Sequence, residues 1–191
     1  MSDKVYKEDE EFSGINFSET VLDRGEYEQC TFRNCNFSGL DLNGITFSEC
    51  VFEGCDLSMA KLLNVSFKDV QFRNCKLLGL RFDECNKLLL SFYFEGCVLN
   101  FSSFYKLKLK SIVFKDCKLQ DVEFMEADLT KARFQDCDLS RATFENTILE
   151  CADLRTAFNY SINPEVNRIS KAKFSLPGIA GLLDTYKIII E

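Results

Sequence analysis

Hydrophobic residues return at every fifth position along most of this chain. The segment from Phe114 to Phe134, FKDCKLQDVEFMEADLTKARF, shows the pattern clearly, with Phe or Leu at every fifth position and mostly small, polar or charged residues between them. A period of five matches neither the 3.6-residue period of an amphipathic helix nor the two-residue alternation of a half-buried strand. A fixed period that persists over most of a sequence instead predicts a repeat architecture.

The same frame extends in both directions from this segment. It runs unbroken from Phe12 to Phe82 and again from Leu89 to Leu154, and all 29 central positions hold Phe, Leu or Tyr. Between the two runs the next step would fall on Lys87, which is unsuited to a buried centre. We therefore expect a two-residue insertion near 84–88, with the frame restored at Leu89.

The five-residue units, such as CNFSG, CDLSM, ADLTK and CDLSR, resemble the repeats of the pentapeptide-repeat family over about residues 12–156. The resemblance implies an all-β fold: a right-handed quadrilateral parallel β-helix of about seven coils, with one pentapeptide on each side of a square coil. Such a coil holds twenty residues, and a second period of twenty is present, interrupted only by the two-residue insertion, because positions 12, 32, 52, 72, 94, 114 and 134 all hold Phe. Two places after each of these Phe stands Gly, Asn or Asp, which tolerate the positive φ of a tight corner.

The continuous repeat leaves no room for a second core, so we expect one domain with three parts. These parts are an N-terminal cap at 1–11, the β-helix at 12–156 and a C-terminal segment at 157–191. In the last part, apolar residues from Leu176 to Tyr186 recur at helical spacing, and residues 188–190 are expected to form a short strand. A helix of about ten residues is marginal alone and must pack on something.

The sequence leaves open whether the C-terminal segment only covers the last coil or also joins two copies of the chain. Gly178 and Gly181 would allow a close approach of two backbones in a dimer. The candidate dimerisation residues are Leu176, Ile179, Leu182, Leu183 and Tyr186.

Nine of the ten cysteines stand two places before a step of the five-residue frame, counting Cys85 before the step at Lys87, where small apolar residues stand in other repeats. Cys in this position is expected to act as a small buried hydrophobe. Stacked coils would space these thiols by about 4.8 Å, whereas a disulfide requires Cβ atoms about 3.8 Å apart. Neither a signal peptide nor a membrane span is indicated by the sequence. We therefore expect reduced thiols in a cytoplasmic protein.

The composition argues against catalysis. The chain contains no His, which excludes Ser-His-Asp and Cys-His sites and His-ligated metals. The cysteines lack CxxC spacing, and the nine glycines form no phosphate-binding loop. Because the predicted interior is filled by Phe and Leu, we expect no enzyme activity, no catalytic or metal-binding residues and no cofactor.

Negative charge is concentrated at one end of the chain. The formal net charge is −7 overall, of which residues 1–29 carry −6, while residues 30–126 carry none. In the predicted register Asp23, Glu26 and Glu28 point outward near that end. They are candidate partner-binding residues.

A second candidate surface is apolar. Several outward positions of the middle coils hold hydrophobic residues, and a contiguous patch of this kind marks a contact surface. The alternative is that a flanking segment near 88–93 folds back and covers it. The residues are Met59, Leu78, Val98 and Phe101 on the second side and Leu63, Tyr105 and Met125 on the third, with Met59, Leu78, Phe101 and Tyr105 as the candidate contacts.

A pentapeptide tower that ends in a short amphipathic helix resembles the Qnr-type quinolone-resistance group. That resemblance implies a homodimer through the C-terminus and an acidic rod that imitates B-DNA on DNA gyrase or topoisomerase IV. Such a protein would bind a protein partner rather than nucleic acid or membrane, and would protect gyrase from quinolones. Type II topoisomerases hold DNA largely through its phosphate charge, so a rod with spaced carboxylates could compete for that surface. The alternative function is a scaffold that uses the apolar patch to bind an unrelated protein.

Overall fold

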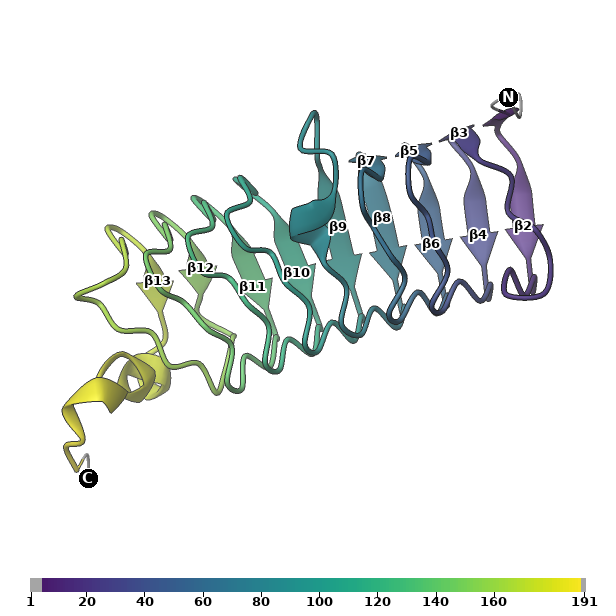
Figure 1. Cartoon of the computed structure of the whole chain (residues 1–191). Helices are drawn as coiled ribbons and strands as arrows, with labels where there is room; N and C mark the ends of the chain where they lie inside the picture. The colour runs from purple at the N-terminus through teal and green to yellow at the C-terminus, as the bar shows by residue number, and fades with distance from the viewer. Residues whose placement is uncertain (1–4, 190–191) are drawn as a thin grey trace.

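The chain winds into a continuous coil (Figure 1), and most of the period-of-five residues are buried in its interior. The computed structural model describes residues 5–189, and it is a tower of short parallel strands stacked along one axis. The strands are β1 Val5–Glu8, β2 Glu11–Ser13, β3 Gly25–Glu28, β4 Thr31–Arg33, β5 Thr46–Ser48, β6 Val51–Glu53, β7 Ser66–Lys68, β8 Val70–Arg73, β9 Phe92–Glu95, β10 Val113–Lys115, β11 Arg133–Gln135, β12 Asp153–Leu154 and β13 Lys173–Phe174. The 3₁₀ helices are η1 Phe82–Glu84, η2 Pro177–Leu182 and η3 Asp184–Tyr186.

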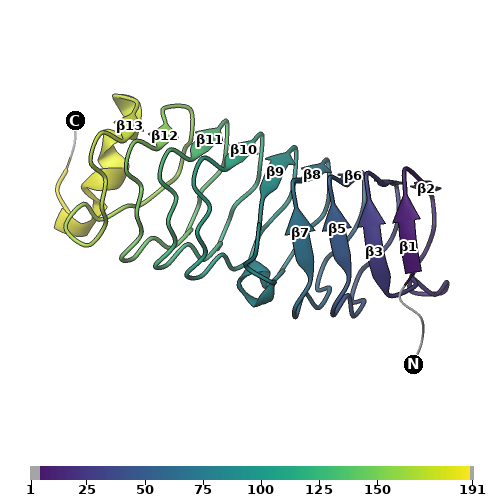
Figure 2. The same cartoon turned by 90° about the horizontal axis from the view of Figure 1, so that it is seen from above.

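Two sides of the tower are parallel sheets, and the other two are joined by isolated parallel bridges. One sheet has the nine strands β2-β4-β6-β8-β9-β10-β11-β12-β13, and the other has the four strands β1-β3-β5-β7. Figure 2 shows the two rows of strands from above. Phe12 pairs with Phe32, and Phe32 with Phe52, so neighbouring strands are one coil apart. The predicted twenty-residue period and the parallel β-helix are confirmed.

Stacked phenylalanine rings fill the interior. Phe52, Phe72 and Phe94 are fully buried, and their rings lie parallel at centroid distances of 5.0 and 5.4 Å. Rings from the adjoining sides meet this column edge-on, as Phe67 meets Phe72 at 5.8 Å. Aromatic pairs favour these stacked and edge-to-face arrangements. In each coil the flat Phe ring of this column therefore packs against the rings of the coil above and the coil below.

The corners adopt the left-handed backbone expected from the sequence. All seven residues two places after the Phe column have a positive φ, between 51° and 66°. Asn and Asp are among the few non-Gly types that adopt this conformation readily. The predicted positive φ is confirmed at Gly14, Asn34, Gly54, Asn74, Gly96, Asp116 and Asp136.

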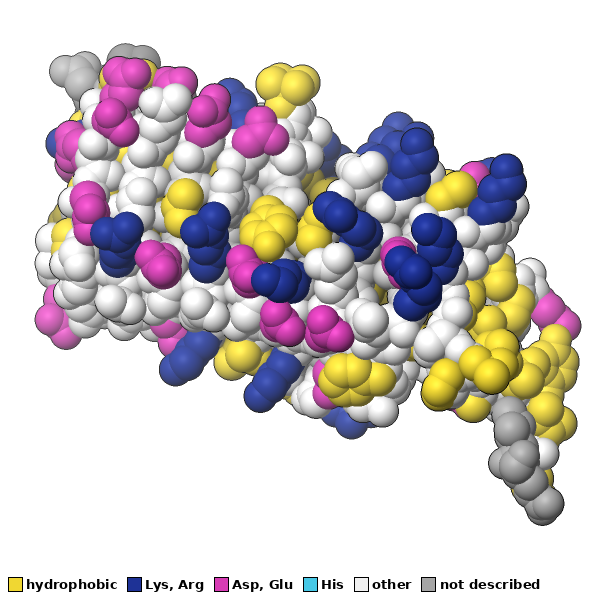
Figure 3. Space-filling model, turned by 180° about the vertical axis from the view of Figure 1, so that it is seen from behind, with side chains coloured by type: hydrophobic (Ala, Val, Ile, Leu, Met, Phe, Trp, Pro, Cys, Tyr) yellow, Lys and Arg dark blue, Asp and Glu magenta, His cyan; other side chains and the backbone are white. Residues whose placement is uncertain are grey.

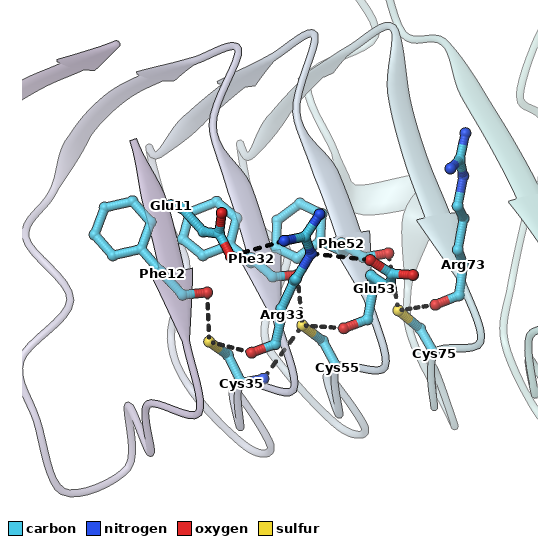
Figure 4. A network of polar contacts seen from close by, with 10 residues as sticks. All are labelled: Glu11, Phe12, Phe32, Arg33, Cys35, Phe52, Glu53, Cys55, Arg73 and Cys75. Carbon is cyan, nitrogen blue, oxygen red and sulfur yellow. Dashed lines mark hydrogen bonds and ion pairs between the residues drawn. The ribbon is translucent and has the colours of Figure 1, made fainter. Parts of the chain in front are cut away.

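Six of the nine buried cysteines form a ladder on one side of the interior, and Figure 4 shows the first three of them, Cys35, Cys55 and Cys75. The thiol of Cys55 lies within hydrogen-bonding distance of the carbonyl oxygens of Phe32 (3.3 Å) and Glu53 (3.5 Å). Thr147 holds the same place in a repeat on another side of a later coil, and its hydroxyl donates to the carbonyl of Phe124 at 2.9 Å. The position therefore suits a small side chain with one donor. Nine cysteines are buried, as predicted, and Cys151 is exposed.

Burial also governs the chemistry of these thiols. It raises the pKa of Cys50 to about 12 because the thiolate would lose its hydration. Only the thiolate is a strong nucleophile, so a thiol of this kind is unreactive at neutral pH. On the outer surface of the same coils, Arg33 bridges Glu11 (2.8 Å) and Glu53 (3.1 Å), but exposed pairs of this kind contribute little to stability.

The coil extends beyond both predicted boundaries. At the N-terminal end, β1 pairs in parallel with β3, so the expected cap at 1–11 is partly a strand of the first coil. At the other end, β13 pairs with β12, which places Phe174 beside Leu154. The nine-stranded sheet therefore spans about eight turns rather than the predicted seven. Asn159 and Pro164 occupy two of the period-of-five positions after Leu154 and hide the last turn in the sequence.

The insertion differs in detail from the expectation. The Asn86 N–H still donates to the Val65 carbonyl, as in the regular register. The register is restored where Val70 pairs with Phe92, so the two extra residues lie between Asn86 and Phe92. Leu89, predicted as a buried centre, is 68% exposed, and that prediction is wrong. Phe92 is buried in its place and contacts Phe67 at 5.5 Å. The segment 87–90 consequently projects from the tower before β9 (Figure 1).

The C-terminal segment also differs from the prediction. It forms the 3₁₀ helices η2 and η3 instead of one amphipathic α-helix. Ile188 and Ile189 are not in a strand, and Ile190 lies outside the described residues. A Cβ atom on Gly181 would clash with the carbonyl oxygen of Tyr160, and one on Gly178 would clash with the Tyr160 hydroxyl. The two glycines therefore allow this segment to pack on the last turn of its own chain.

Candidate functional site

The predicted acidic residues lie on the first complete coil. Glu26 and Glu28 belong to β3 and point outward on either side of the buried Tyr27. The neighbouring strand β1 places Glu8 directly beside Glu28. Adjacent strands are about 4.8 Å apart, so these carboxylates form a closely spaced group on one side of the tower.

Asp23 stands around a corner from this group. It is exposed on the preceding side, and its carbonyl oxygen accepts a hydrogen bond from the buried Tyr27 hydroxyl at 2.7 Å. Arg24, at the corner itself, forms an ion pair with Asp41 at 3.3 Å. The structure therefore brings Glu26 and Glu28 together, while Asp23 lies on the neighbouring side of the same coil.

Two tyrosines near these carboxylates have a raised pKa. The Tyr6 hydroxyl donates to Glu28 Oε2 at 2.6 Å, and this hydrogen bond, with the negative charges of Glu28 and Glu8, raises the Tyr6 pKa well above its usual range. Burial, followed by the charge of Asp23, raises the pKa of Tyr27. Acidic side chains are densest near the N-terminal end in Figure 3, while Lys and Arg gather toward the other half of this face.

The apolar side chains of the middle coils are uncovered but do not form one continuous patch. Met59 is 67% and Phe101 65% exposed, whereas Leu78 and Tyr105 are half-buried. The alternative that residues 88–93 fold back over this surface is therefore wrong. Met59, Gly79 and Phe101 follow one corner on successive coils, and the Met59 sulfur leans over Gly79. Tyr105 lies at the far edge of the next side, where its hydroxyl donates to Glu126 at 3.0 Å.

The backbone at this corner is left-handed, as it is at many other corners of the tower. Met59 and Phe101 have φ values of 59° and 64°, in positions where the adjoining coils have Gly39 and Gly79. A bulky residue in the left-handed region costs roughly 1–2 kcal/mol. Bulky residues such as Lys131 and Arg141 take the same conformation elsewhere, so the fold tolerates this cost at its corners.

The five predicted dimerisation residues are divided between two environments. Leu176 is 84% exposed, and Ile179 and Tyr186 are also exposed. Leu182 instead packs against the core of its own chain, and Leu183 is half-buried. The exposed members, with Ile188 and Ile189, leave an apolar surface at the end of the tower, which is visible in Figure 3.

Other kinds of site find little support. Within residues 5–189 no group of three or more metal-ligating side chains is placed to hold an ion. No helix in the described part of the chain is long and apolar enough to cross a membrane. A hollow of about 560 Å³ lies between the last turn and η2, with Phe158, Tyr160 and Asp184 in its lining.

Comparison with known proteins agrees with this architecture. A family model described as a pentapeptide repeat region matches residues 26–92 and 87–157. The chain belongs to the pentapeptide-repeat family. No curated protein matches the sequence.

Solved structures of QnrB1, a plasmid-mediated fluoroquinolone resistance protein, share the pentapeptide-repeat fold. A trypsin-treated variant of QnrB1 superposes with a TM-score of 0.59 at 19% identity, covering 98% of this chain and all of the other. The full-length protein gives a TM-score of 0.58 at 18% identity, covering 96% and 100%. At this level of identity the likeness is one of fold.

Sequence reasoning missed several surface features of this pentapeptide-repeat tower. Tyr6 was unassigned, although Val5 and Lys7 stand twenty residues before Gly25 and Tyr27 and so continue the long period. The left-handed positions of Met59 and Phe101 could have been found from their place in the repeat, two residues after a centre. The exposed loop around Leu89 had no such signal, because any of its leucines could have filled the core.

Proposed function

We propose that this protein binds a type II topoisomerase, DNA gyrase or topoisomerase IV, in the place of DNA, and so acts in the cytoplasm as a non-enzymatic quinolone-resistance or gyrase-protecting factor. The acidic group on the first coil carries the proposal: Glu8, Glu26 and Glu28 are presented side by side on a rigid rod. The fold that the chain shares with QnrB1 supports it.

The dimensions of the tower suit such a role. Eight turns at about 4.8 Å each give a rod of about 38 Å. Two rods joined end to end would span about 75 Å, the length of about 22 base pairs at about 3.4 Å per step. An enzyme that recognises spaced phosphates would then meet carboxylates at both ends of a rod of similar length.

We further propose that two chains join at their C-terminal ends. Substitution of the exposed Leu176 and Ile189 by Asp should convert a dimer to a monomer, because both side chains are more than four-fifths exposed and contribute no core packing. Light scattering at about 100 µM gives the mass. Val21→Asp, at an equally exposed position near the opposite end, is the matched control and should remain dimeric. A wild-type protein that is monomeric at this concentration would refute the dimer.

A supercoiling assay with DNA gyrase tests the function. The protein should change the extent to which gyrase supercoils a relaxed plasmid. It should also restore the supercoiling activity of gyrase that a fluoroquinolone has blocked. A chain without effect in either reaction, over a range of concentrations that reaches tens of micromolar, would contradict the proposal.

The corner formed by Met59, Gly79 and Phe101 supports a second function, that of a scaffold for an unrelated protein. Met59 and Phe101 are 67% and 65% exposed, at positions where the adjoining coils have Gly39 and Gly79. Neither residue fills the core, and large exposed apolar side chains of this kind favour a contact surface.

Phe101→Gly separates this contact role from stability. The substitution removes the left-handed strain of about 1–2 kcal/mol, offset by the greater freedom of Gly in the unfolded chain. The free energy of unfolding in urea should therefore stay unchanged or rise by up to about 1 kcal/mol. A loss of more than about 2 kcal/mol would show that Phe101 is a structural residue.

A further inference from the structure

The two-residue insertion opens a hollow that is lined by lysines. This hollow has a volume of about 390 Å³, and its lining is Lys87, Leu90, Lys106, Leu107 and Lys108. A smaller one of about 90 Å³ shares Leu90 and Lys108 and adds Lys110 to its lining. The larger volume falls in the range of small-molecule sites.

The insertion also frees a backbone donor beside the hollow. In the next two coils the equivalent N–H groups donate to the preceding coil, from Asp128 to Leu107 at 2.8 Å and from Ile148 to Ala127 at 2.9 Å. The N–H of Lys108 has no such partner within residues 5–189, because the segment 87–90 leaves the ladder at this point. By the same geometry it points along the axis toward the preceding coil, on the side where Lys87 and Leu90 line the hollow.

The charges around this hollow are only partly compensated. Lys106 forms an ion pair with Glu126, and Lys110 one with Asp128, both at 3.4 Å. Lys87 and Lys108 have no carboxylate within 4.0 Å in the described part of the chain, and Glu84, which precedes the insertion, forms no ion pair with either. Two ammonium groups that line one hollow repel each other, and an anion between them would remove that repulsion.

We propose that the hollow binds a small anion carrying phosphate groups. Lysine is a flexible point charge with three donors and is common in phosphate sites. The unpartnered N–H of Lys108 adds a donor of the kind that backbone anion sites use. Leu90 provides an apolar side chain in the lining for the organic part of such a ligand. This site is separate from the acidic coil and does not depend on the proposed function.

Pyrophosphate is the probe that tests the site. Isothermal titration of the full chain should give saturable binding, and the backbone amide resonance of Lys108 should shift during the titration. The double variant Lys87→Gln/Lys108→Gln should bind at least ten-fold more weakly. The matched control Lys61→Gln/Lys118→Gln removes two exposed lysines on other sides of the tower, neither of which has an ion pair within residues 5–189. It should bind as the wild type does.

Three results would overturn the proposal. The first is an absence of saturable pyrophosphate binding, and the second is an equal loss in both double variants, which would indicate non-specific attraction. The third is binding of citrate as tight as that of pyrophosphate, which would show a general anion site without preference for phosphate. Circular dichroism of each variant confirms the fold, which the exposed lysines should not affect.

Discussion

Phe72→Ala is expected to destabilise the protein by about 3–5 kcal/mol. The ring is fully buried and stacks between those of Phe52 and Phe94, at 5.0 and 5.4 Å. Phe67 and Phe92 contact it from the side. The backbone ladder fixes the spacing of the coils, so these neighbours cannot collapse into the space that the ring leaves.

Equilibrium unfolding in urea measures this loss. Phe101→Ala provides the comparison, because it removes an aromatic ring of the same size that is 65% exposed. Its cost should be far smaller than that of Phe72→Ala. Equal losses at the two positions would show that the assignment of inward and outward residues is wrong in the middle of the tower.

The triple variant Asp23→Asn/Glu26→Gln/Glu28→Gln is expected to lower the affinity for gyrase by at least ten-fold. It removes three negative charges from the first coil while preserving side-chain shape. The amide oxygen of Gln at position 28 can still accept the Tyr6 hydrogen bond. Folding should be nearly unchanged, because exposed charges contribute little to stability. The binding that remains should weaken further with added salt, which screens ion pairs.

A matched variant distinguishes the effect of the charges on the first coil from the effect of the total negative charge of the protein. Asp116→Asn/Asp136→Asn/Glu145→Gln removes three exposed carboxylates from later coils, none of which has an ion pair in the described part of the chain. It should reduce the affinity much less than the first-coil variant does. If the first-coil variant binds normally while Phe101→Ser or Tyr105→Ser abolishes binding, the apolar surface is the site and DNA mimicry must be given up.

Most of the fold could be predicted because the sequence of each five-residue repeat shows which of its residues points inward. A centre such as Phe52 or Phe114 must be apolar whatever its neighbours are, and the twenty-residue period then fixes which residues stack. The prediction failed where this redundancy ended. At the insertion, Leu89 and Phe92 competed for one place in the core, and the larger ring beside Phe67 occupies it. Beyond Leu154, the next two positions of the period hold Asn159 and Pro164 instead of apolar residues. The pattern therefore did not reveal the last turn, in which Phe174 pairs with Leu154.

The candidate sites were predicted less completely than the fold. Period-of-five counting correctly gave the outward direction of Glu26 and Phe101. It could not show that Tyr6 bonds to Glu28, since that contact joins two coils through a strand outside the predicted repeat. Nor did it show that Gly178 and Gly181 contact Tyr160, because their small size suits a contact within one chain as well as one between two. Such features depend on contacts between residues far apart in the sequence, which the repeat pattern does not specify.

Competition between this protein and DNA for gyrase tests the central claim most directly. Fluorescence anisotropy of the labelled chain measures its binding to gyrase, and linear duplex DNA is then added in increasing amounts. If the acidic coil occupies the DNA-binding surface, the duplex should displace the protein completely, with a midpoint that rises in proportion to protein concentration. Binding that persists unchanged at saturating DNA would contradict the account.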